Sequence, residues 1–227
     1  QRDASGFLKY REFDLFTGAV TREIVDFNTS STDFDLDGTL NGSDPDVITV
    51  PTGWSTPAGG GAHLLTDISV DILGRPTKVT DPNRKVTFYT YNNVNKEMRM
   101  YRGWSGSAGT ATLPTLVIRG DRARGYVEVL TMSATPNTSG SSPSKVPTGT
   151  ESISSIQSLE RSIFNTGGQL VAADVYFKSG LSYSTSTTIG YPGVDYLRTT
   201  IGYDDGGRLS RITRPDGTFI HTVYDGL

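Results

Sequence analysis

One turn motif returns along this chain at a fixed spacing, and it constrains the fold more than any other feature. The motif Tyr-Asp-Asp-Gly-Gly-Arg-Leu stands at residues 203–209, Pro-Asp-Gly follows at 215–217, and a second Tyr-Asp pair comes at 224–225, 21 residues after the first. Residues 208–213 alternate with the period of two that is typical of strands, and residues 218–224 are rich in β-branched and aromatic side chains. Each copy is therefore expected to be a β-hairpin whose apolar face needs neighbouring hairpins to cover it.

The same spacing recurs upstream. Residues 70–75 (Val-Asp-Ile-Leu-Gly-Arg) lead to Pro82 and then to Tyr91, again 21 residues on. In both copies the proline lies eight residues after the glycine of the turn, so two independent spacings agree. Residues 164–170 (Phe-Asn-Thr-Gly-Gly-Gln-Leu) form a third copy, with Phe for Tyr and Asn for Asp.

Weaker copies and departures are also present. Phe13-Asp14 and Phe34-Asp35 are degenerate candidates, themselves 21 residues apart. Val70 stands where the tyrosine is expected, and the turn at residues 82–84 lacks the usual glycine. The alignment still predicts that the aromatic residues of the motif end strands in equivalent environments and that its glycines lie in turns. The aromatic residues are Tyr91, Phe164, Tyr203 and Tyr224, and the glycines are Gly74, Gly168 and Gly207.

The pattern Y-D-x-x-G-R-L, then P-D-G, then Y-D resembles the RHS/YD-repeat family of large surface and toxin-carrying proteins. In that family β-hairpins are wound in succession into a curling or spiralling antiparallel sheet. The sheet either forms a hollow cocoon around a C-terminal toxin or serves as a cell-surface and adhesion scaffold. The resemblance implies an all-β fold over residues 1–227, as a fragment of a longer array. The repeats predict a fold and do not by themselves imply a catalytic site.

Composition removes several other classes of function. A net charge of −3 argues against nucleic-acid binding, which would require a basic stripe. No apolar run approaches the roughly 18 residues of a membrane span. Cysteine is absent, so neither a disulfide nor a thiolate is available. With only His63 and His221 and no known catalytic motif, we expect no enzyme activity.

Polar inserts separate the repeats. Residues 52–62 and 133–150 are rich in Ser, Thr, Gly and Pro, which predicts loops. Residues 151–163 fit both a helix and a strand, and we favour a strand because the segment leads directly into the third copy. Trp54 and Trp104 lie in glycine-rich loops, where an exposed ring could stack on a sugar. We expect instead that both rings fold back against the sheet.

One segment predicts a metal site, because residues 33–44 match a twelve-residue calcium loop. Oxygen side chains stand at loop positions 1, 3, 5 and 9, Gly38 stands at position 6, and a carboxylate closes position 12. Thr39 would offer its backbone carbonyl at position 7. The predicted ligands of the structural Ca²⁺ are Asp33, Asp35, Asp37, Thr39, Asn41 and Asp44. The alternative is an acidic, solvated hairpin made from the degenerate repeat at Phe34.

The function expected from these features is that of a non-enzymatic structural module of a secreted or cell-surface RHS/YD-repeat protein. It would be a calcium-stabilised scaffold for adhesion or assembly. A wall segment of a cocoon that encapsulates a C-terminal toxin is the alternative, and a carbohydrate-binding module is a further one. The expected partners are neighbouring repeats or other copies of the chain, paired through the last strand, and also cell-surface glycans or an enclosed toxin domain.

Overall fold

The computed structural model describes residues 1–31, 33, 50–121, 125–185 and 188–225. These residues form strands, turns and loops, and none of them is helical. The predicted all-β class is therefore confirmed. No helix of this part of the chain has the length and apolar character that a membrane crossing requires.

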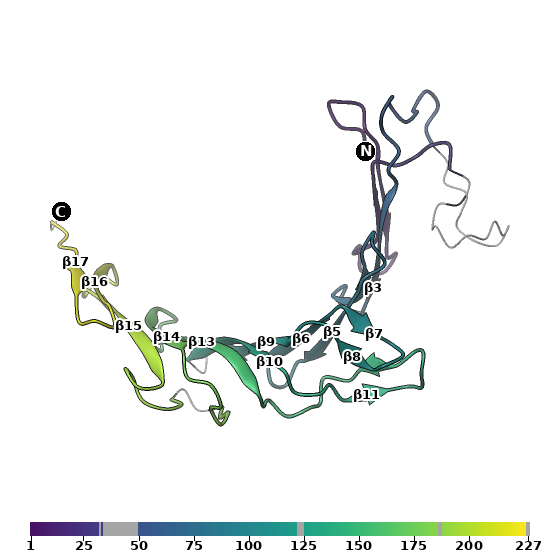
Figure 1. Ribbon diagram of the computed structural model, residues 1–227. Coiled ribbons are helices and arrows are strands. Elements are labelled where there is room, and N and C mark those ends of the chain that lie inside the picture. The colour runs from purple at the N-terminus through teal and green to yellow at the C-terminus, as the bar shows by residue number, and fades with distance from the viewer. Residues whose placement is uncertain (32, 34–49, 122–124, 186–187, 226–227) are drawn as a thin grey trace. The chain divides into compact units, whose positions relative to one another are not determined.

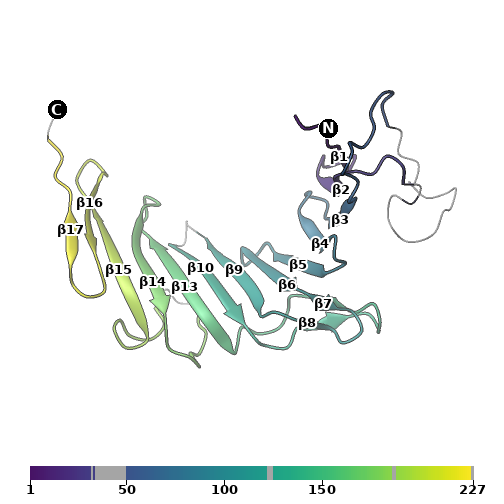
Figure 2. The ribbon, with the colours of Figure 1, turned by 45° about the horizontal axis from the view of Figure 1, so that its top comes forward.

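Within the described ranges, thirteen strands follow one another in a single antiparallel sheet, in the order of the sequence apart from two small hairpins (Figures 1 and 2). The strands are β1 (Lys9–Phe13), β2 (Val20–Val25), β3 (Leu64–Val70), β4 (Pro76–Thr80), β5 (Val86–Asn92), β6 (Glu97–Arg102), β9 (Thr115–Asp121), β10 (Tyr126–Met132), β13 (Ile156–Phe164), β14 (Leu170–Tyr176), β15 (Tyr196–Tyr203), β16 (Leu209–Thr213) and β17 (Phe219–His221). The small hairpins pair β7 (Trp104–Ser105) with β8 (Thr110–Ala111), and β11 (Thr138–Ser139) with β12 (Val146–Pro147).

The chain divides into two compact units, Gln1–Phe88 and Tyr89–Leu227. In the first unit a small core forms around Leu8, Ile24, Phe27 and Leu65. In the second, strands lie side by side from β6 to β17, and the two longest inserts leave this sheet between β10 and β13 and between β14 and β15 (Figure 2).

The predicted repeat is a recurring turn with one set of backbone hydrogen bonds. In each of the three full copies, the N–H of the turn glycine donates to the carbonyl three residues earlier at 2.9 Å. The first turn residue donates its own N–H to the carbonyl four residues later, again at 2.9 Å. The first residues of the three turns are Asp71, Asn165 and Asp204. The turn glycines Gly74, Gly168 and Gly207 have φ values of 74°, 78° and 75°. The prediction that these glycines lie in turns is confirmed, and their positive φ explains the residue type.

The same turn tolerates changes of sequence and length. At residues 81–85, where the glycine is missing, Arg84 takes the left-handed conformation with φ 58°. Its N–H donates to the Asp81 carbonyl at 2.8 Å, so the hydrogen bond is kept although a residue with a Cβ pays strain there. The degenerate copy at Asp14 forms a turn that is one residue longer, with Gly18 at φ 70°.

Strand ends agree with the alignment only in part. Phe164 and Tyr203 are the last residues of β13 and β15, and each follows a register shift that marks a bulge. Tyr91 is the second-last residue of β5. Tyr224 lies beyond β17, which ends at His221, so the strand predicted for residues 218–224 is shorter than expected. β17 pairs with β16 at three positions, Arg211, Ile212 and Thr213, and the Thr222 N–H then makes one further hydrogen bond to the Ser210 carbonyl.

The inserts cover one face of the sheet in the second unit. The ambiguous segment 151–163 forms strand β13 from Ile156 onward, so the strand assignment is confirmed for most of it. Residues 133–150 are loop apart from the short β11–β12 hairpin, as predicted. The main core joins buried side chains of the strands to apolar side chains of both inserts. From the strands come Val117, Leu130, Met132, Ile156, Leu159, Tyr176 and Tyr196, and from the inserts Ala134, Ile153, Leu181, Tyr183 and Ile189.

Candidate functional site

A row of charged side chains with alternating sign crosses the covered face of the second unit. Each member lies directly opposite the next in the register of neighbouring strands. The row runs through Glu97 (β6), Arg119 (β9), Glu128 (β10), Arg161 (β13), Asp174 (β14) and Arg198 (β15). We call these six residues the charge ladder. Opposite charges across a strand pair stabilise the pairing, whereas a slip of one residue would break every contact of the ladder.

Three ion pairs form the steps of the charge ladder. Arg161 Nε lies 2.8 Å from Glu128 Oε2, and both side chains are fully buried. Arg198 binds Asp174 with two parallel hydrogen bonds of 2.6 Å, the fork geometry in which arginine recognises a carboxylate best. Arg119 Nε is 3.7 Å from a carboxylate oxygen of the buried Glu97. Buried charges are costly unless each is paired, and each member of the charge ladder has a partner of opposite charge.

Tyr183 clamps the insert between β14 and β15 onto the charge ladder. Its hydroxyl donates to Glu128 and accepts from Arg119 Nη1 at 2.7 Å. Burial and then the neighbouring Glu128 carboxylate raise the pKa of this hydroxyl. Arg161 Nη2 adds a hydrogen bond of 2.6 Å to the Ser184 carbonyl. The loop between β14 and β15, which no sequence feature singled out, is thus fixed at its middle by buried polar contacts.

A second clamp holds the other insert. The buried Arg99 lies 2.7 Å from Glu97 and 2.9 Å from Glu151, and Tyr101 donates its hydroxyl to Glu151 at 2.7 Å. The Asn137 N–H binds the second oxygen of the same carboxylate at 3.2 Å. Burial raises the pKa of Glu151, but the hydrogen bonds from Tyr101 and Arg99 outweigh it and leave the pKa below its usual range.

The aspartates of the repeat turns serve structure through their side chains. Asp71 accepts the backbone N–H of Arg75 at 3.0 Å and pairs with its guanidinium at 2.7 Å. Asp204 repeats both contacts with Arg208, each at 2.8 Å. The pKa of Asp71 is lowered, first by the Arg75 side chain, and that of Asp204 is lowered, first by the Arg208 N–H. The charged carboxylates are therefore part of the turns themselves.

Tyrosines of the motif connect one hairpin to the preceding one. The Tyr203 hydroxyl donates to the Leu170 carbonyl at 2.9 Å, and the Tyr224 hydroxyl donates to the Leu209 carbonyl at the same distance. Leu170 and Leu209 occupy the same place in successive copies of the motif. The Tyr224 ring also lies under the Arg208 guanidinium, 4.4 Å from its centre.

The two tryptophans differ. Trp104 is buried, packs edge-on against Tyr101 and donates its ring N–H to the Lys145 carbonyl at 2.8 Å, so it folds back as predicted. Trp54 is 36% exposed and lines an apolar cavity of about 210 Å³ in the first unit, together with Tyr10 and Phe27. Trp104 therefore cannot stack on a sugar, because its ring is not available to a ligand.

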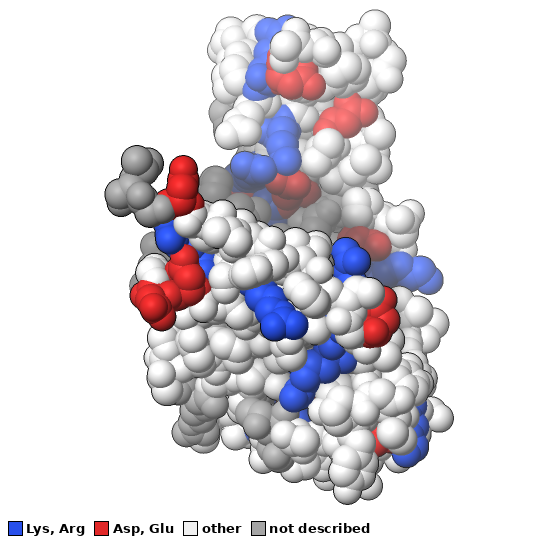
Figure 3. Space-filling view, turned by 90° about the vertical axis from the view of Figure 1, so that its left-hand side faces the viewer, with Lys and Arg blue, Asp and Glu red and all other residues white. Residues whose placement is uncertain are grey.

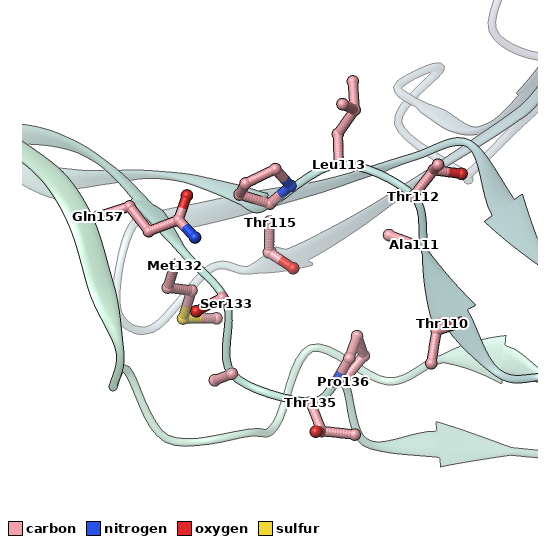
Figure 4. A pocket seen from close by; sticks show the side chains of 12 residues that line it. Thr110, Ala111, Thr112, Leu113, Thr115, Met132, Ser133, Thr135, Pro136 and Gln157 are labelled. Atoms are coloured by element: carbon pink, nitrogen blue, oxygen red, sulfur yellow. The ribbon is translucent and has the colours of Figure 1, made fainter.

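A neutral cleft of about 330 Å³ opens in the second unit, where β9 begins and β10 ends (Figure 4). Residues 110–115 form one wall, residues 132–136 form the other, and Gln157 of β13 reaches in from the side. Threonine, serine and glutamine side chains alternate with proline, leucine and methionine around it. No sequence feature pointed to this cleft, because its walls are far apart along the chain.

The predicted calcium ligands fall almost entirely outside the described residues. Only Asp33 is described, and Ser31 donates its hydroxyl to the Asp33 carbonyl at 2.9 Å. Asp35, Asp37, Thr39, Asn41 and Asp44 lie in the part of the chain that the structure does not describe. Within the described ranges no group of three or more His, Cys, Asp or Glu residues is placed to hold a metal ion.

Charges of both signs are interspersed on the face drawn in Figure 3, and most of that face is neutral. Among the described residues of the second unit, the buried acids and bases take part in the ion pairs and clamps given above, except Asp195, which pairs with Lys178 and accepts the Tyr191 N–H at 2.8 Å. Comparison with known proteins gave no match, either among models of protein families or among curated sequences.

Proposed function

We propose that this chain is a non-enzymatic structural segment of an RHS/YD-repeat protein that is secreted or displayed on a cell surface. The observation that carries the proposal is the recurrence of one unit in three dimensions. The turns that start at Asp71, Asn165 and Asp204 have the same hydrogen bonds, and motif tyrosines bind the leucine carbonyl of the preceding copy. A unit that is completed by its neighbour is suited to building a wall.

The outer edge of the sheet supports the expected partners. In the described part of the chain β17 pairs on one side, with β16, and its Phe219 and Ile220 are 58% and 49% exposed. An unpaired edge is a template for another strand. Neighbouring repeats or a further copy of the chain would cover both the edge and these side chains.

A cocoon wall is the second candidate, and one surface favours it. The uncovered face of the second unit carries a row of partly exposed apolar side chains opposite one another: Ile118, Val129, Val175 and Leu197, interrupted by Glu160. A wall that faces an enclosed toxin domain would present such a surface inward.

Surface labelling separates the two candidates. An epitope inserted after Gly180, in the insert between β14 and β15, leaves the strands intact and lies at an exposed glycine. A surface scaffold is labelled by antibody on intact source cells. Labelling that requires permeabilisation would contradict the surface function and favour the enclosed wall.

The proposed calcium loop has its own test. Chelation is expected to lower the melting temperature, because an ion that binds only the folded state adds about 2.7 kcal/mol at a hundredfold excess over its Kd. Asp35→Ala should abolish the response, whereas Asp205→Ala, in a repeat turn, should keep it. Identical melting curves with calcium and with chelator would remove the ion from the proposal.

A further inference from the structure

Two neighbouring turns of the first unit carry large apolar side chains at their tips. Leu15 and Phe16, in the turn between β1 and β2, are 96% and 98% exposed. Ile72 and Leu73, in the turn between β3 and β4, are 92% and 63% exposed. Exposure of such side chains to water is unfavourable, and apolar groups gathered on a surface mark an interaction site. We call these four residues the apolar tips.

The two turns lie against each other at one end of the sheet. The hairpins β1–β2 and β3–β4 are neighbours because β2 pairs with β3. Gly74 of the second turn approaches the first turn so closely that a Cβ there would lie 3.1 Å from the Thr17 Cβ and 3.3 Å from the Ala19 Cβ. The apolar tips therefore project from adjoining turns, although they are far apart in the sequence.

The backbone of the repeat turn does not require apolar residues at these positions. In two other copies with the same backbone hydrogen bonds, the second and third turn residues are Thr166 and Gly167, and Asp205 and Gly206. Polar and small residues of this kind are usual in turns. The geometry of the turn therefore does not explain why the first unit has large apolar side chains there.

The turns satisfy much of their own backbone, which suits them to apolar surroundings. The Asp14 carboxylate accepts the Phe16 N–H at 3.2 Å, and the Asp71 carboxylate accepts the Leu73 N–H at 2.9 Å. The glycine of each turn donates to the carbonyl of the same aspartate at 2.9 Å. Unpaired backbone groups are a main cost of placing a loop in a hydrocarbon environment, and these bonds reduce that cost.

The area and charge of the apolar tips favour a lipid surface over a protein partner. A stable protein interface buries about 800 Å² on each partner, contributed by roughly 20–30 residues, and two turn tips provide only part of this. A lipid surface needs no complementary shape, because binding scales with the apolar area that is buried. The two turns contain one cation, Arg75, and it pairs with Asp71 at 2.7 Å, so charge does not select anionic lipids.

We propose that the apolar tips anchor the first unit to the surface of a zwitterionic lipid bilayer. The four side chains enter the boundary between headgroups and acyl chains, the depth at which phenylalanine and leucine side chains of interfacial segments lie. The proposal goes beyond the structural role given above. Because it is tested on the isolated chain, failure of the calcium test or of the surface-labelling test leaves it unaffected.

Binding is tested by co-sedimentation of the 227-residue chain with lipid vesicles. One set of vesicles contains phosphatidylcholine alone, and the other contains phosphatidylcholine with phosphatidylglycerol. We expect the chain to bind both sets with similar affinity. High salt should have little effect, because salt screens charges and the binding is driven by apolar burial.

A chain with polar tips provides the contrast. It combines Leu15→Ser, Phe16→Ser, Ile72→Thr and Leu73→Gly, so that its second turn has the tip residues of the third copy of the motif. Affinity for both sets of vesicles should fall about tenfold or more, since the apolar area is lost. Val194→Ser is the matched control, because Val194 is 60% exposed in the insert between β14 and β15, and it should bind like the unchanged chain. Circular dichroism verifies that both variants are folded.

A fluorescent probe locates the contact. The chain has no cysteine, so one introduced cysteine can be labelled specifically with a dye that responds to the polarity of its surroundings. Ile72→Cys places the dye at an apolar tip, and Thr166→Cys places it at the same position of the third copy. Phosphatidylcholine vesicles should shift the emission of the first dye to shorter wavelength and leave that of the second unchanged.

Several outcomes would overturn the proposal. One is that the unchanged chain sediments with neither set of vesicles, or only with the anionic set and only at low salt. Another is that the chain with polar tips binds as tightly as the unchanged chain, or that both dyes respond equally. A third is that the unchanged chain self-associates through its tips and binds no vesicles, since this would assign the tips to a second copy of the chain.

Discussion

At the scale of single residues, a few side chains carry the repeat. The first residue of each turn caps backbone amides, the glycine takes a positive φ, and the tyrosine reaches back to the preceding hairpin. Each role follows from the chemistry of the residue type: an oxygen acceptor, a missing Cβ, and a long ring with a terminal donor. This explains why the motif persists while the residues between its positions vary.

The tyrosine contact can be measured. Tyr203→Phe removes the hydroxyl that donates to the Leu170 carbonyl and leaves the ring in place. The free energy of unfolding of the second unit should fall by about 1 kcal/mol, the usual net value of one such bond. Urea denaturation gives this difference.

Tyr191→Phe is the matched control, because Tyr191 is 74% exposed and its hydroxyl has no bond to the described residues. Its stability should not change. Equal effects of the two substitutions would show that the hydroxyl of Tyr203 does not join the hairpins.

At this scale the sequence was informative because the motif is local. The turn at Asp204 closes within five residues, so its composition alone identifies it. The position of Tyr224 was harder to predict, since the strand pairing of β17 ends at His221 while Tyr224 still reaches the Leu209 carbonyl through its side chain. The left-handed Arg84 could not be foreseen, because the neighbouring strands impose that turn where the sequence gives no glycine.

At the scale of strands and inserts, buried ion pairs lie beside the apolar core of the second unit. The charge ladder lies on the same face as the core, and Glu128 and Leu130 are successive inward residues of β10. Its members come from six strands and act only when the register brings them together. The sequence could not reveal the ladder, because Glu128 and Arg161 are 33 residues apart and Glu128 and Tyr183 are 55 apart.

Removing one member of the charge ladder should be costly. Arg161→Met leaves the buried Glu128 without its arginine and frees the insert at Ser184. We expect a loss of about 3 kcal/mol or more in the free energy of unfolding, as for a broken buried ion pair. Hydrogen exchange should also become faster in residues 177–185.

Glu160→Gln provides the comparison, since Glu160 is the preceding residue on the exposed face of the same strand. Its change should be within about 0.5 kcal/mol. The ladder would lose its structural role if Arg161→Met were as mild as Glu160→Gln.

Acid should release the insert between β10 and β13. Because the pKa of Glu151 is lowered in the folded chain, its carboxylate stabilises the fold above the unfolded pKa of about 4.3. This contribution is lost as the pH falls through the lower, folded pKa. Melting temperatures between neutral pH and about pH 3 should therefore fall steeply.

Glu151→Gln should weaken that dependence. The variant should be less stable at neutral pH, by about 3 kcal/mol, the lower end of the range for a broken buried pair, because Arg99 keeps Glu97. Its melting temperature should then depend less on pH than that of the unchanged chain. An identical pH profile for both proteins would exclude Glu151 as the titrating group.

At the scale of the whole molecule, the account depends on one unit being used several times. The repeated turns belong to both compact units, with Asp71 in the first and Asn165 and Asp204 in the second. The all-β class and the hairpin order followed from the spacing of the motif, whereas the inserts and their clamps followed from contacts that only the fold creates. The turns and their hydrogen bonds therefore repeat along the chain, whereas the clamps depend on contacts between segments that are far apart in the sequence.

Residue-resolved hydrogen exchange tests this central claim most directly. The amides to follow are those that the repeat turn bonds: Gly74, Gly168 and Gly207 to the carbonyl of the first turn residue, and Arg75, Gln169 and Arg208 to its side chain. The account predicts that all six are protected, whereas the amide of Gly180, a loop glycine with a similar φ of 74° and no bond to the described residues, exchanges rapidly. If the amides of any one copy exchanged as rapidly as that of Gly180, the three turns would not be one repeated unit.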